Sequence, residues 1–153
     1  MSSPATAATR ELDRLGIPYR LVFHGPVSSA EEAAEKRGIP IGALAKTLVV
    51  RLDEGVYLLA LVPGDSGLDY KKLRNHLGMR RLTMPDPDEA RAVTGFERGT
   101  ITPFGAGEHR IVVDQALMDL DEVSVGSGTH GWAIHVHPSA LVTMGAESAD
   151  IAR

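Results

Sequence analysis

The sequence predicts an α/β fold, a single compact domain of mixed sheet, and two observations carry this prediction. Apolar, β-branched runs at 45–52 and 56–62 flank the turn Asp53-Glu54-Gly55, which is the pattern of a central hairpin. The remaining elements are short and do not alternate regularly as strand, helix, strand. With 153 residues and no repeat or linker, the chain is expected to be one domain over 1–153, frayed at about 1–5 and 145–153.

The first half of the chain marks its helices clearly. Gly16, Gly38 and Gly78 each follow a helical stretch, as helix-ending glycines do. Ser28 and Ser29 each stand three residues before a glutamate, which is the capping-box spacing. The expected elements are helices at 6–15, 30–37 and 69–78, strands at 19–23, 45–52 and 56–62, and a tight turn or short helix at 39–44.

The second half is expected to contain shorter elements around two glycine-containing loops. Asp86-Pro87-Asp88-Glu89 places acidic residues and a proline where a helix N-terminus favours them. The expected elements are strands at 80–84, 110–113, 122–125 and 132–136, helices at 88–94 and 138–142, and a turn or short helix at 115–120. The two loops are 99–105 and 126–131.

Composition excludes several classes of function. The formal net charge of −4 argues against broad, non-specific binding to DNA or RNA, although a local contact remains possible. The chain has no cysteine, so it forms no disulfide and has no thiol nucleophile. No apolar run approaches membrane-spanning length, and the N-terminus lacks the pattern of a secretion signal. A cytoplasmic protein with no membrane partner is therefore expected.

Lys46 is the most unusual residue of the central hairpin, because it stands at the entrance of an apolar strand. An unpaired ammonium is costly to bury, so this side chain must either reach water or meet an anion. The first alternative makes Lys46 a surface residue, and the second makes it part of a ligand site.

Positive charge is concentrated in one short segment of this acidic chain. Two interpretations are open: the exposed face of a helix, or a patch that contacts phosphates. The residues concerned are Lys71, Lys72, Arg74, His76, Arg80 and Arg81.

The loop 126–131 matches G-x-G-x-x-G, but its context differs from a dinucleotide site. The following residues 132–137 alternate like a strand, whereas the dinucleotide fingerprint requires a helix there. A hairpin loop is therefore expected, and its bare N–H groups can still face a ligand. Ser127 is not the centre of a G-x-S-x-G elbow, because Val125 and Thr129 occupy the outer positions.

His135 and His137 are two residues apart and are expected to share one face of a strand. The spacing is compatible with a metal, but no third ligand lies nearby in sequence. A solvent-facing pair is therefore the expected arrangement. A metal-dependent hydrolase built on the two histidines remains the weaker alternative, and no metal ligand is assigned.

Three elements in this order resemble the YbaK/ProX family of aminoacyl-tRNA editing domains, which are also found inserted in bacterial prolyl-tRNA synthetases. They are Lys46-Thr47 at the start of an apolar strand, Gly99-x-x-x-Pro103, and Ser127-Gly128-x-x-Gly131. The resemblance extends from residue 28 to 141. It implies the compact mixed α/β fold of that family. The sequence departs from the family at Thr129-His130, where members often carry lysine or arginine.

The resemblance also implies a function and a set of residues. The chain would be a free-standing trans-editing deacylase that hydrolyses the ester of mischarged aminoacyl-tRNA, in particular mischarged prolyl-tRNA. The implied catalytic residues are Lys46, Gly99, Thr102 and Pro103. The implied substrate-binding residues are Thr47, Thr100, Ile101, Ser127, Gly128 and Gly131. The basic residues expected to contact tRNA are Lys71, Lys72, Arg74, Arg80 and Arg81.

The expected chemistry needs no cofactor and no protein nucleophile, because an aminoacyl ester is already activated. The site must position a water molecule and stabilise an oxyanion, and backbone N–H groups of the two glycine loops can do this. The expected partners are mischarged tRNA and, transiently, prolyl-tRNA synthetase. A homologue that binds tRNA or a synthetase without hydrolysis is the alternative, and the presence of Lys46 and both loops argues against it. Pocket size would select the amino acid, whose identity the sequence leaves open.

Overall fold

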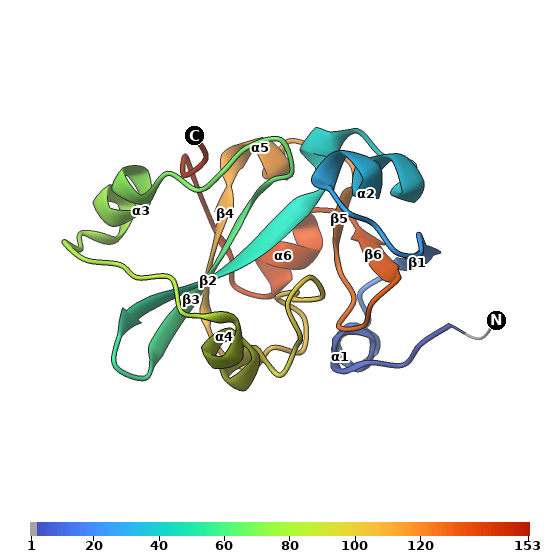
Figure 1. Ribbon diagram of the computed structural model, residues 1–153, viewed down its shortest axis with the longest axis horizontal. Coiled ribbons are helices and arrows are strands. Elements are labelled where there is room, and N and C mark those ends of the chain that lie inside the picture. The colour runs from blue at the N-terminus through green and yellow to red at the C-terminus, as the bar shows by residue number, and fades with distance from the viewer. Residues whose placement is uncertain (1–2) are drawn as a thin grey trace.

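The computed structural model describes residues 3–153 and contains two sheets (Figure 1). The larger sheet has the strand order β2-β3-β4-β7, and the smaller has the order β1-β6-β5. The prediction of a mixed α/β domain with a central hairpin is thus confirmed. None of the helices built from the described residues is long and apolar enough to cross a membrane.

The elements follow the expected order closely. The helices are α1 (Ala7–Leu15), α2 (Ala30–Arg37), α3 (Tyr70–Leu77), α4 (Pro87–Thr94), α5 (Gln115–Met118) and α6 (Ser139–Thr143), with the 3-10 turn η1 (Ile41–Ala43). The strands are β1 (Arg20–Phe23), β2 (Ala45–Asp53), β3 (Val56–Pro63), β4 (Arg110–Asp114), β5 (Val123–Gly126), β6 (Trp132–Val136) and β7 (Glu147–Ala149).

The helices begin and end where their capping residues stand. The side chains of Ser29, Asp69 and Asp86 each accept a hydrogen bond from a backbone N–H of the first helical turn. Of the two serines with capping-box spacing, Ser29 is the N-cap of α2. Gly38 ends that helix with φ of 72°, a left-handed conformation that glycine adopts without strain.

The larger sheet is built on the hairpin of β2 and β3, whose strands are antiparallel. β3 pairs in parallel with β4, and β4 pairs in parallel with β7. β2 is consequently an edge strand. In the smaller sheet β6 is central and pairs antiparallel with β1 and β5. A strand therefore follows the loop 126–131, as expected for a hairpin and not for a dinucleotide-binding helix.

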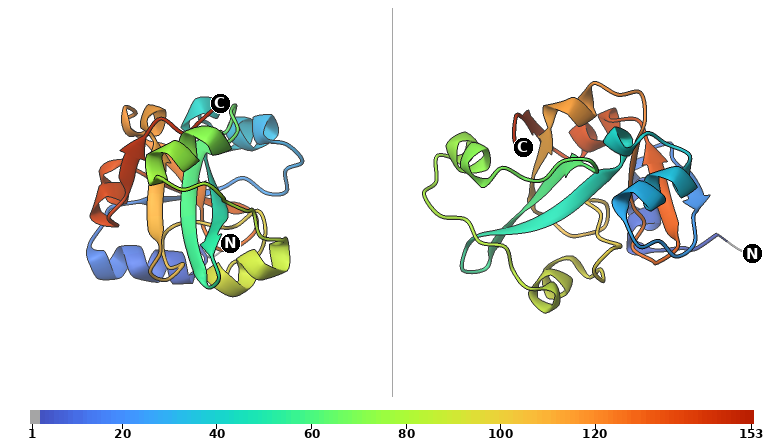
Figure 2. Two further views of the ribbon diagram at one scale, coloured as in Figure 1. Left: turned by 90° about the vertical axis from the view of Figure 1, so that its left-hand side faces the viewer. Right: turned by 45° about the horizontal axis from the view of Figure 1, so that its top comes forward.

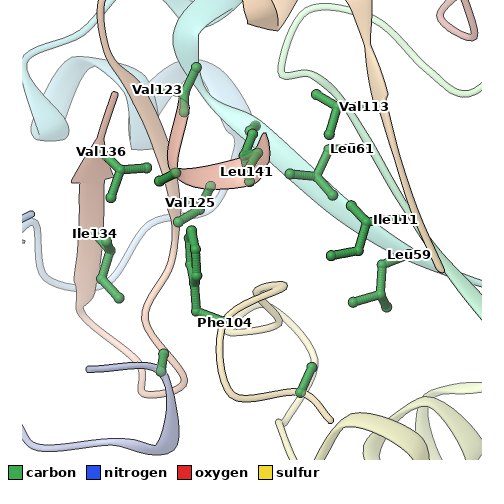
Figure 3. Packing of buried hydrophobic residues seen from close by; sticks show 14 of the residues in the cluster. Leu59, Leu61, Phe104, Ile111, Val113, Val123, Val125, Ile134, Val136 and Leu141 are labelled. Atoms are coloured by element: carbon green, nitrogen blue, oxygen red, sulfur yellow. The ribbon is translucent and has the colours of Figure 1, made fainter. Parts of the chain in front are cut away.

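The main core fills the space between the two sheets, and Figure 3 shows its centre. Leu59 and Leu61 of β3 face this core, while Leu58 and Ala60 face the opposite side of the sheet. That opposite side forms a second cluster, which α3 covers with Leu73. α3 and α4 are well separated in every view of Figures 1 and 2.

The strand expected at 80–84 is absent. This segment makes one isolated bridge, in which Thr83 exchanges two backbone hydrogen bonds with Arg51 of β2, at 2.7 and 3.1 Å. Only Leu82 is half-buried in the segment, and its neighbours are exposed. Without an apolar face to bury, the segment crosses the edge of β2 at one point and does not pair along it.

The expectation that residues 145–153 fray is wrong. They form β7 beside β4, and Ile151 is completely buried. The Asp114 carboxylate accepts hydrogen bonds from the backbone N–H groups of Ile151 and Ala152, at 3.0 and 2.9 Å. Three residues are too short for a strand to be recognised from apolar alternation. At the other end, residues 1 and 2 of the expected frayed segment lie outside the described residues, and 3–5 belong to no helix or strand.

An ion pair also attaches β7 to β4. Arg110 binds Glu147 through two nitrogens at 2.5 and 2.8 Å, and His76 lies 3.1 Å from the same carboxylate. The hydrogen bond from Arg110, followed by that from His76, lowers the pKa of Glu147 to about 2. Because the pKa is lowered in the folded state, this carboxylate contributes to stability above pH ~4.5, and the contribution is lost as the pH falls through about 2.

The buried position of Ile151 predicts that Ile151→Ala lowers the free energy of unfolding by about 2–5 kcal/mol, through lost burial and the cavity left behind. Val142→Ala is the matched control, because Val142 is 57% exposed and its truncation should cost less than about 0.5 kcal/mol. Urea unfolding of both variants measures the difference. Equal stability of the two would show that the segment 147–151 contributes nothing to the core.

Candidate active site

A cavity of about 470 Å³ lies along the outer edge of β2 and is bounded by the start of α4 and the loop before Thr102. It is the pocket that contains the start of the Lys46 strand. Its lining residues are Arg37, residues 44–49, Met84, Pro85, Pro87, Ala90, Arg98, Gly99, Ile101 and Gly126.

The cavity exists because β2 is paired on its outer side only at its two ends. Leu44, just before β2, bridges to Ser124 of β5, and Arg51 bridges to Thr83. Neighbouring residues of a strand direct their N–H and C=O groups to opposite sides, so Thr47 and Val49 direct theirs to the same side as Arg51. Backbone donors and acceptors of β2 therefore face the cavity between the two bridges.

Three cations line the cavity, and no acidic side chain does. They are Arg37, Lys46 and Arg98. Within residues 3–153, none of the three has a carboxylate oxygen within 4.0 Å of its charged nitrogens. Positive charge without counter-charge gives the cavity a positive potential on a chain whose net charge is −4. The geometry is suited to an anionic ligand.

Lys46 is half-buried, and its Nζ donates a hydrogen bond to the backbone carbonyl oxygen of Ser66. Ser66 lies in the loop between β3 and α3. The acceptor is a neutral carbonyl, so this hydrogen bond does not pair the ammonium with a negative charge. Thr47, on the opposite face of β2, has a buried Oγ1 without a hydrogen-bond partner.

Arg37 is the last residue of α2, and it lines the cavity from the side of the smaller sheet. Its Nη1 donates to the Oγ of Ser124 at 3.1 Å, while its Nε is buried and has no partner. Burial lowers the pKa of the Arg37 guanidinium from its ordinary value. Arginine nevertheless stays charged at any ordinary pH.

The loop carrying Gly99 and Pro103 supplies the cavity with Gly99 and Ile101 only. Thr100 is buried, and its hydroxyl donates to the carbonyl oxygen of Glu97 at 2.7 Å. Thr102 and Pro103 are also buried and do not line the cavity. The structure thus brings Gly99 and Ile101 together with Lys46, whereas the other three predicted residues of the loop are buried and do not line the cavity: Thr100, Thr102 and Pro103.

The loop 126–131 packs against the loop 99–105 and supports the residues that line the cavity. Ser127 is fully buried, with its Oγ 2.9 Å from the carbonyl oxygen of Thr129 and 2.8 Å from that of Trp132. The N–H of Gly128 donates to the carbonyl oxygen of Thr100 at 3.0 Å. Ser127, Gly128 and Gly131 do not line the cavity, whereas Gly126 does.

The basic residues expected to contact tRNA lie outside the cavity. Lys72 binds the Asp150 carboxylate at 2.9 Å and the carbonyl oxygen of Ala152 at 2.8 Å. Lys71, Arg80 and Arg81 are exposed, and Arg74 is half-buried.

His135 and His137 do not form a solvent-facing pair, contrary to expectation. His135 is 1% exposed because it lies on the central strand of the smaller sheet, and burial is the main cause that lowers its pKa. Its Nδ1 lies 3.1 Å from Arg20 Nη2. His137 is exposed and contacts Ser139. Over residues 3–153, no three histidine, aspartate or glutamate side chains group in a way that could hold a metal.

Sequence reasoning missed Arg37, Arg98 and Gly126. Arg98 directly precedes Gly99, so its proximity to the loop was a usable signal. Arg37 gives no such signal, because a basic residue in the last turn is common in any helix. Its position depends on the bridge between Leu44 and Ser124, which brings Ser124 to the end of α2.

The lining thus combines three cationic side chains with mostly apolar residues, and among the described residues it includes no serine or cysteine. Residues 24–144 match the family model of the aminoacyl-tRNA editing domain. The chain belongs to this family, and it is an enzyme that deacylates mischarged aminoacyl-tRNA.

Several relatives support this membership. The Ser/Thr-tRNA deacylase ProXp-y of Escherichia coli is 32% identical over 76% of this chain and 73% of its own length. The proposed Cys-tRNA(Pro)/Cys-tRNA(Cys) deacylase EbsC of Enterococcus faecalis is 28% identical over 91% and 87%. The proline–tRNA ligase of Thermosipho africanus is 34% identical over 69% of this chain, which matches only 18% of the ligase.

A solved structure shares the whole fold. The crystal structure of a proposed trans-editing enzyme for prolyl-tRNA synthetase superimposes with a TM-score of 0.86 at 30% identity, covering 99% of each chain.

The contact between the two glycine loops predicts that Gly126→Ala lowers the free energy of unfolding by about 1–3 kcal/mol. A Cβ at Gly126 would lie 2.5 Å from the carbonyl oxygen of Ile101 and 2.7 Å from that of Thr100, neither of which can move freely. Gly42→Ala is the control, since a Cβ there has only an Asp65 oxygen at 4.0 Å. Thermal and urea unfolding compare the variants, and a fully stable Gly126→Ala would contradict the close packing of the loops.

Proposed function

We propose that this deacylase acts in trans on mischarged tRNA(Pro), with the 3′-terminal aminoacyl adenosine held in the cavity beside β2. The observation that carries the proposal is the charge of the lining: three cations without carboxylate partners and no acidic residue. The 3′ end of tRNA brings a phosphodiester, whose negative charge such a lining attracts. The apolar residues Leu48, Met84 and Ile101 offer surface to the base and to the amino-acid side chain.

Each part of the site has a proposed role. Arg98 is exposed and stands at the mouth, where the phosphodiester of a bound tRNA end would lie. Lys46 fixes the orientation of the ester and ribose, and the loop at Gly99 offers backbone N–H groups to the aminoacyl carbonyl. Thr47 supplies a buried hydroxyl without a partner. Thr102, Pro103 and Ser127 support these groups by holding the two loops together.

The choice of tRNA(Pro) is supported by the relatives. The names of two of them contain proline–tRNA ligase and Cys-tRNA(Pro), and that of the structural neighbour contains prolyl-tRNA synthetase. A chain that is similar to a segment of the ligase can meet the same tRNA in a transient complex with the synthetase. The direct test is a deacylation panel of tRNA(Pro) charged with alanine, cysteine, serine, threonine or proline, with other correctly charged tRNAs beside it. Removal of proline itself at the same rate would overturn an editing role.

The position of Lys46 predicts that Lys46→Ala lowers the deacylation rate at least 100-fold, because the ester loses the group that orients it. The melting temperature should stay close to the parent value, since Nζ bonds only a loop carbonyl. Lys36→Ala is the control: this lysine is exposed, does not line the cavity, and its variant should keep full activity. A folded, fully active Lys46→Ala protein would exclude this role.

The basic residues of α3 and the following segment are proposed to contact the tRNA acceptor stem. Arg80 and Arg81 are exposed and have no carboxylate partner in the part of the chain that the structure describes, whereas Lys72 is bound to Asp150. Arg80→Ala/Arg81→Ala should therefore weaken binding of every tRNA about equally and reduce the salt slope by roughly one unit per contact. Lys71→Ala/Lys72→Ala should have a smaller effect. Both variants should keep the deacylation rate at saturating tRNA. If neither variant changes the salt dependence of binding, the basic cluster is an exposed surface that does not contact tRNA.

A further inference from the structure

Among the cations of the cavity, Arg37 is distinguished by a buried guanidinium nitrogen that has no hydrogen-bond partner within residues 3–153. The Nε of Arg37 is buried and has no hydrogen-bond partner. Within residues 3–153, the one hydrogen bond of the guanidinium goes from Nη1 to the neutral hydroxyl of Ser124. A buried donor nitrogen without an acceptor is costly, so the fold retains an unfavourable feature here. Such features are typical of groups that receive their partner from a ligand.

Thr47 carries a second donor of the same kind. Its Oγ1 is also buried and unpartnered, and both residues line the cavity. Arg98, in contrast, is exposed at the mouth. A phosphodiester must remain connected to the tRNA outside the cavity, so it fits the exposed Arg98. The donors of Arg37 and Thr47 are buried, so they fit the aminoacyl ester, which enters furthest.

We infer that Arg37 is a catalytic residue, which together with the Thr47 hydroxyl stabilises the oxyanion formed on the ester carbonyl during deacylation. This inference rests on the proposed function. Ser124 is a positioning residue, because its hydroxyl holds the guanidinium by Nη1 while Nε is left without a protein partner.

The reaction balances without any further reagent. The oxygen of a water molecule attacks the carbonyl carbon of the ester, and the π electrons move to the carbonyl oxygen, where Arg37 and Thr47 donate hydrogen bonds. The bond from that carbon to the ribose oxygen then breaks. The proton lost by the water goes to solvent, and the ribose oxygen takes up a proton. The products are the free amino acid and a tRNA with its terminal hydroxyl restored. Hydrogen bonds to the oxyanion strengthen as charge develops, so they lower the barrier and hardly affect binding.

The kinetic test compares Arg37→Gln with Arg98→Gln on the best substrate of the panel. Arg37→Gln should lower kcat roughly 100-fold or more with little change in KM. Arg98→Gln should raise KM and leave kcat close to the parent value. Arg91→Gln, exposed on α4 and absent from the lining, is the control that should change neither. An Arg37→Gln enzyme with raised KM and normal kcat would show that Arg37 binds the ground state, and an unaffected one would show a structural role; either overturns the inference.

Two milder variants guard against loss of folding. Arg37→Lys keeps the charge but not the fixed Nε donor, and should recover little of kcat. Ser124→Ala retains the Arg37 guanidinium but removes the hydroxyl that positions it, so kcat should fall by a smaller factor than in Arg37→Gln. If Ser124→Ala and Arg37→Lys are both folded and retain the parental kcat, the inference fails whatever Arg37→Gln does.

A binding experiment separates this inference from the proposed function. Two stable analogues of the tRNA end are titrated by calorimetry: adenosine bearing a 3′-aminoacyl amide, which imitates the ester, and adenosine bearing a 3′-aminoalkylphosphonate, which imitates the charged tetrahedral state. The parent protein should bind the phosphonate more tightly, and Arg37→Gln should lose this preference while still binding the amide. If this binding preference is observed but no substrate of the panel is hydrolysed, the proposed substrates are rejected and the anion site at Arg37 is retained. Equal preference in both proteins would overturn the role of Arg37.

Discussion

The site depends on the incomplete pairing of β2. On its inner side this strand pairs with β3 along almost its whole length, with a register shift after Arg51. On its outer side, within residues 3–153, the chain is bridged only at Leu44 and Arg51. The interval leaves a row of backbone groups and the side chains of Lys46 and Thr47 beside a cavity. An unprotected edge strand is usually a hazard for aggregation, and here the crossing segment and the end of β5 close it at both ends. The same two bridges therefore shorten the exposed edge of β2 and leave the pocket between them.

The second requirement of the site is the close contact of the two glycine-containing loops. Gly126 and Gly128 lie against backbone and against Phe96, and the N–H of Gly128 binds the carbonyl oxygen of Thr100. Residues that the family resemblance associates with the pocket, such as Thr102 and Ser127, lie in this contact and not in the lining. The burial of Thr102 and the hydrogen bonds of Ser127 hold the loops that carry Gly99 and Ile101. Such support keeps a binding geometry precise even where the site residues lie in loops and not in helices or strands.

The sequence was sufficient for most of the fold, and insufficient where long-range pairing decides the structure. Caps, glycines and apolar runs are local signals, so α2, α3 and the hairpin of β2 and β3 were predicted within a residue or two. β7 was not, because three residues without an apolar pattern become a strand only when β4 provides the adjacent edge. Arg37 was missed for a similar reason: its role arises from Ser124, which lies 87 positions further along the chain. Lys46 could be singled out as a cavity residue because a lysine in an apolar strand is anomalous without any knowledge of its surroundings.

The pairing of β7 with β4 has a consequence for the order in which the protein is made. Synthesis proceeds from the N-terminus, so the hairpin of β2 and β3 is available long before residues 147–153 leave the ribosome. Those last residues complete the larger sheet, and Arg153 binds the loop of Ser66 and Gly67, whose carbonyl oxygen at Ser66 holds Lys46. A nascent chain can thus have most of its core while the lysine is still unanchored. The site is therefore completed only after residues 147–153 have been made and have joined the larger sheet.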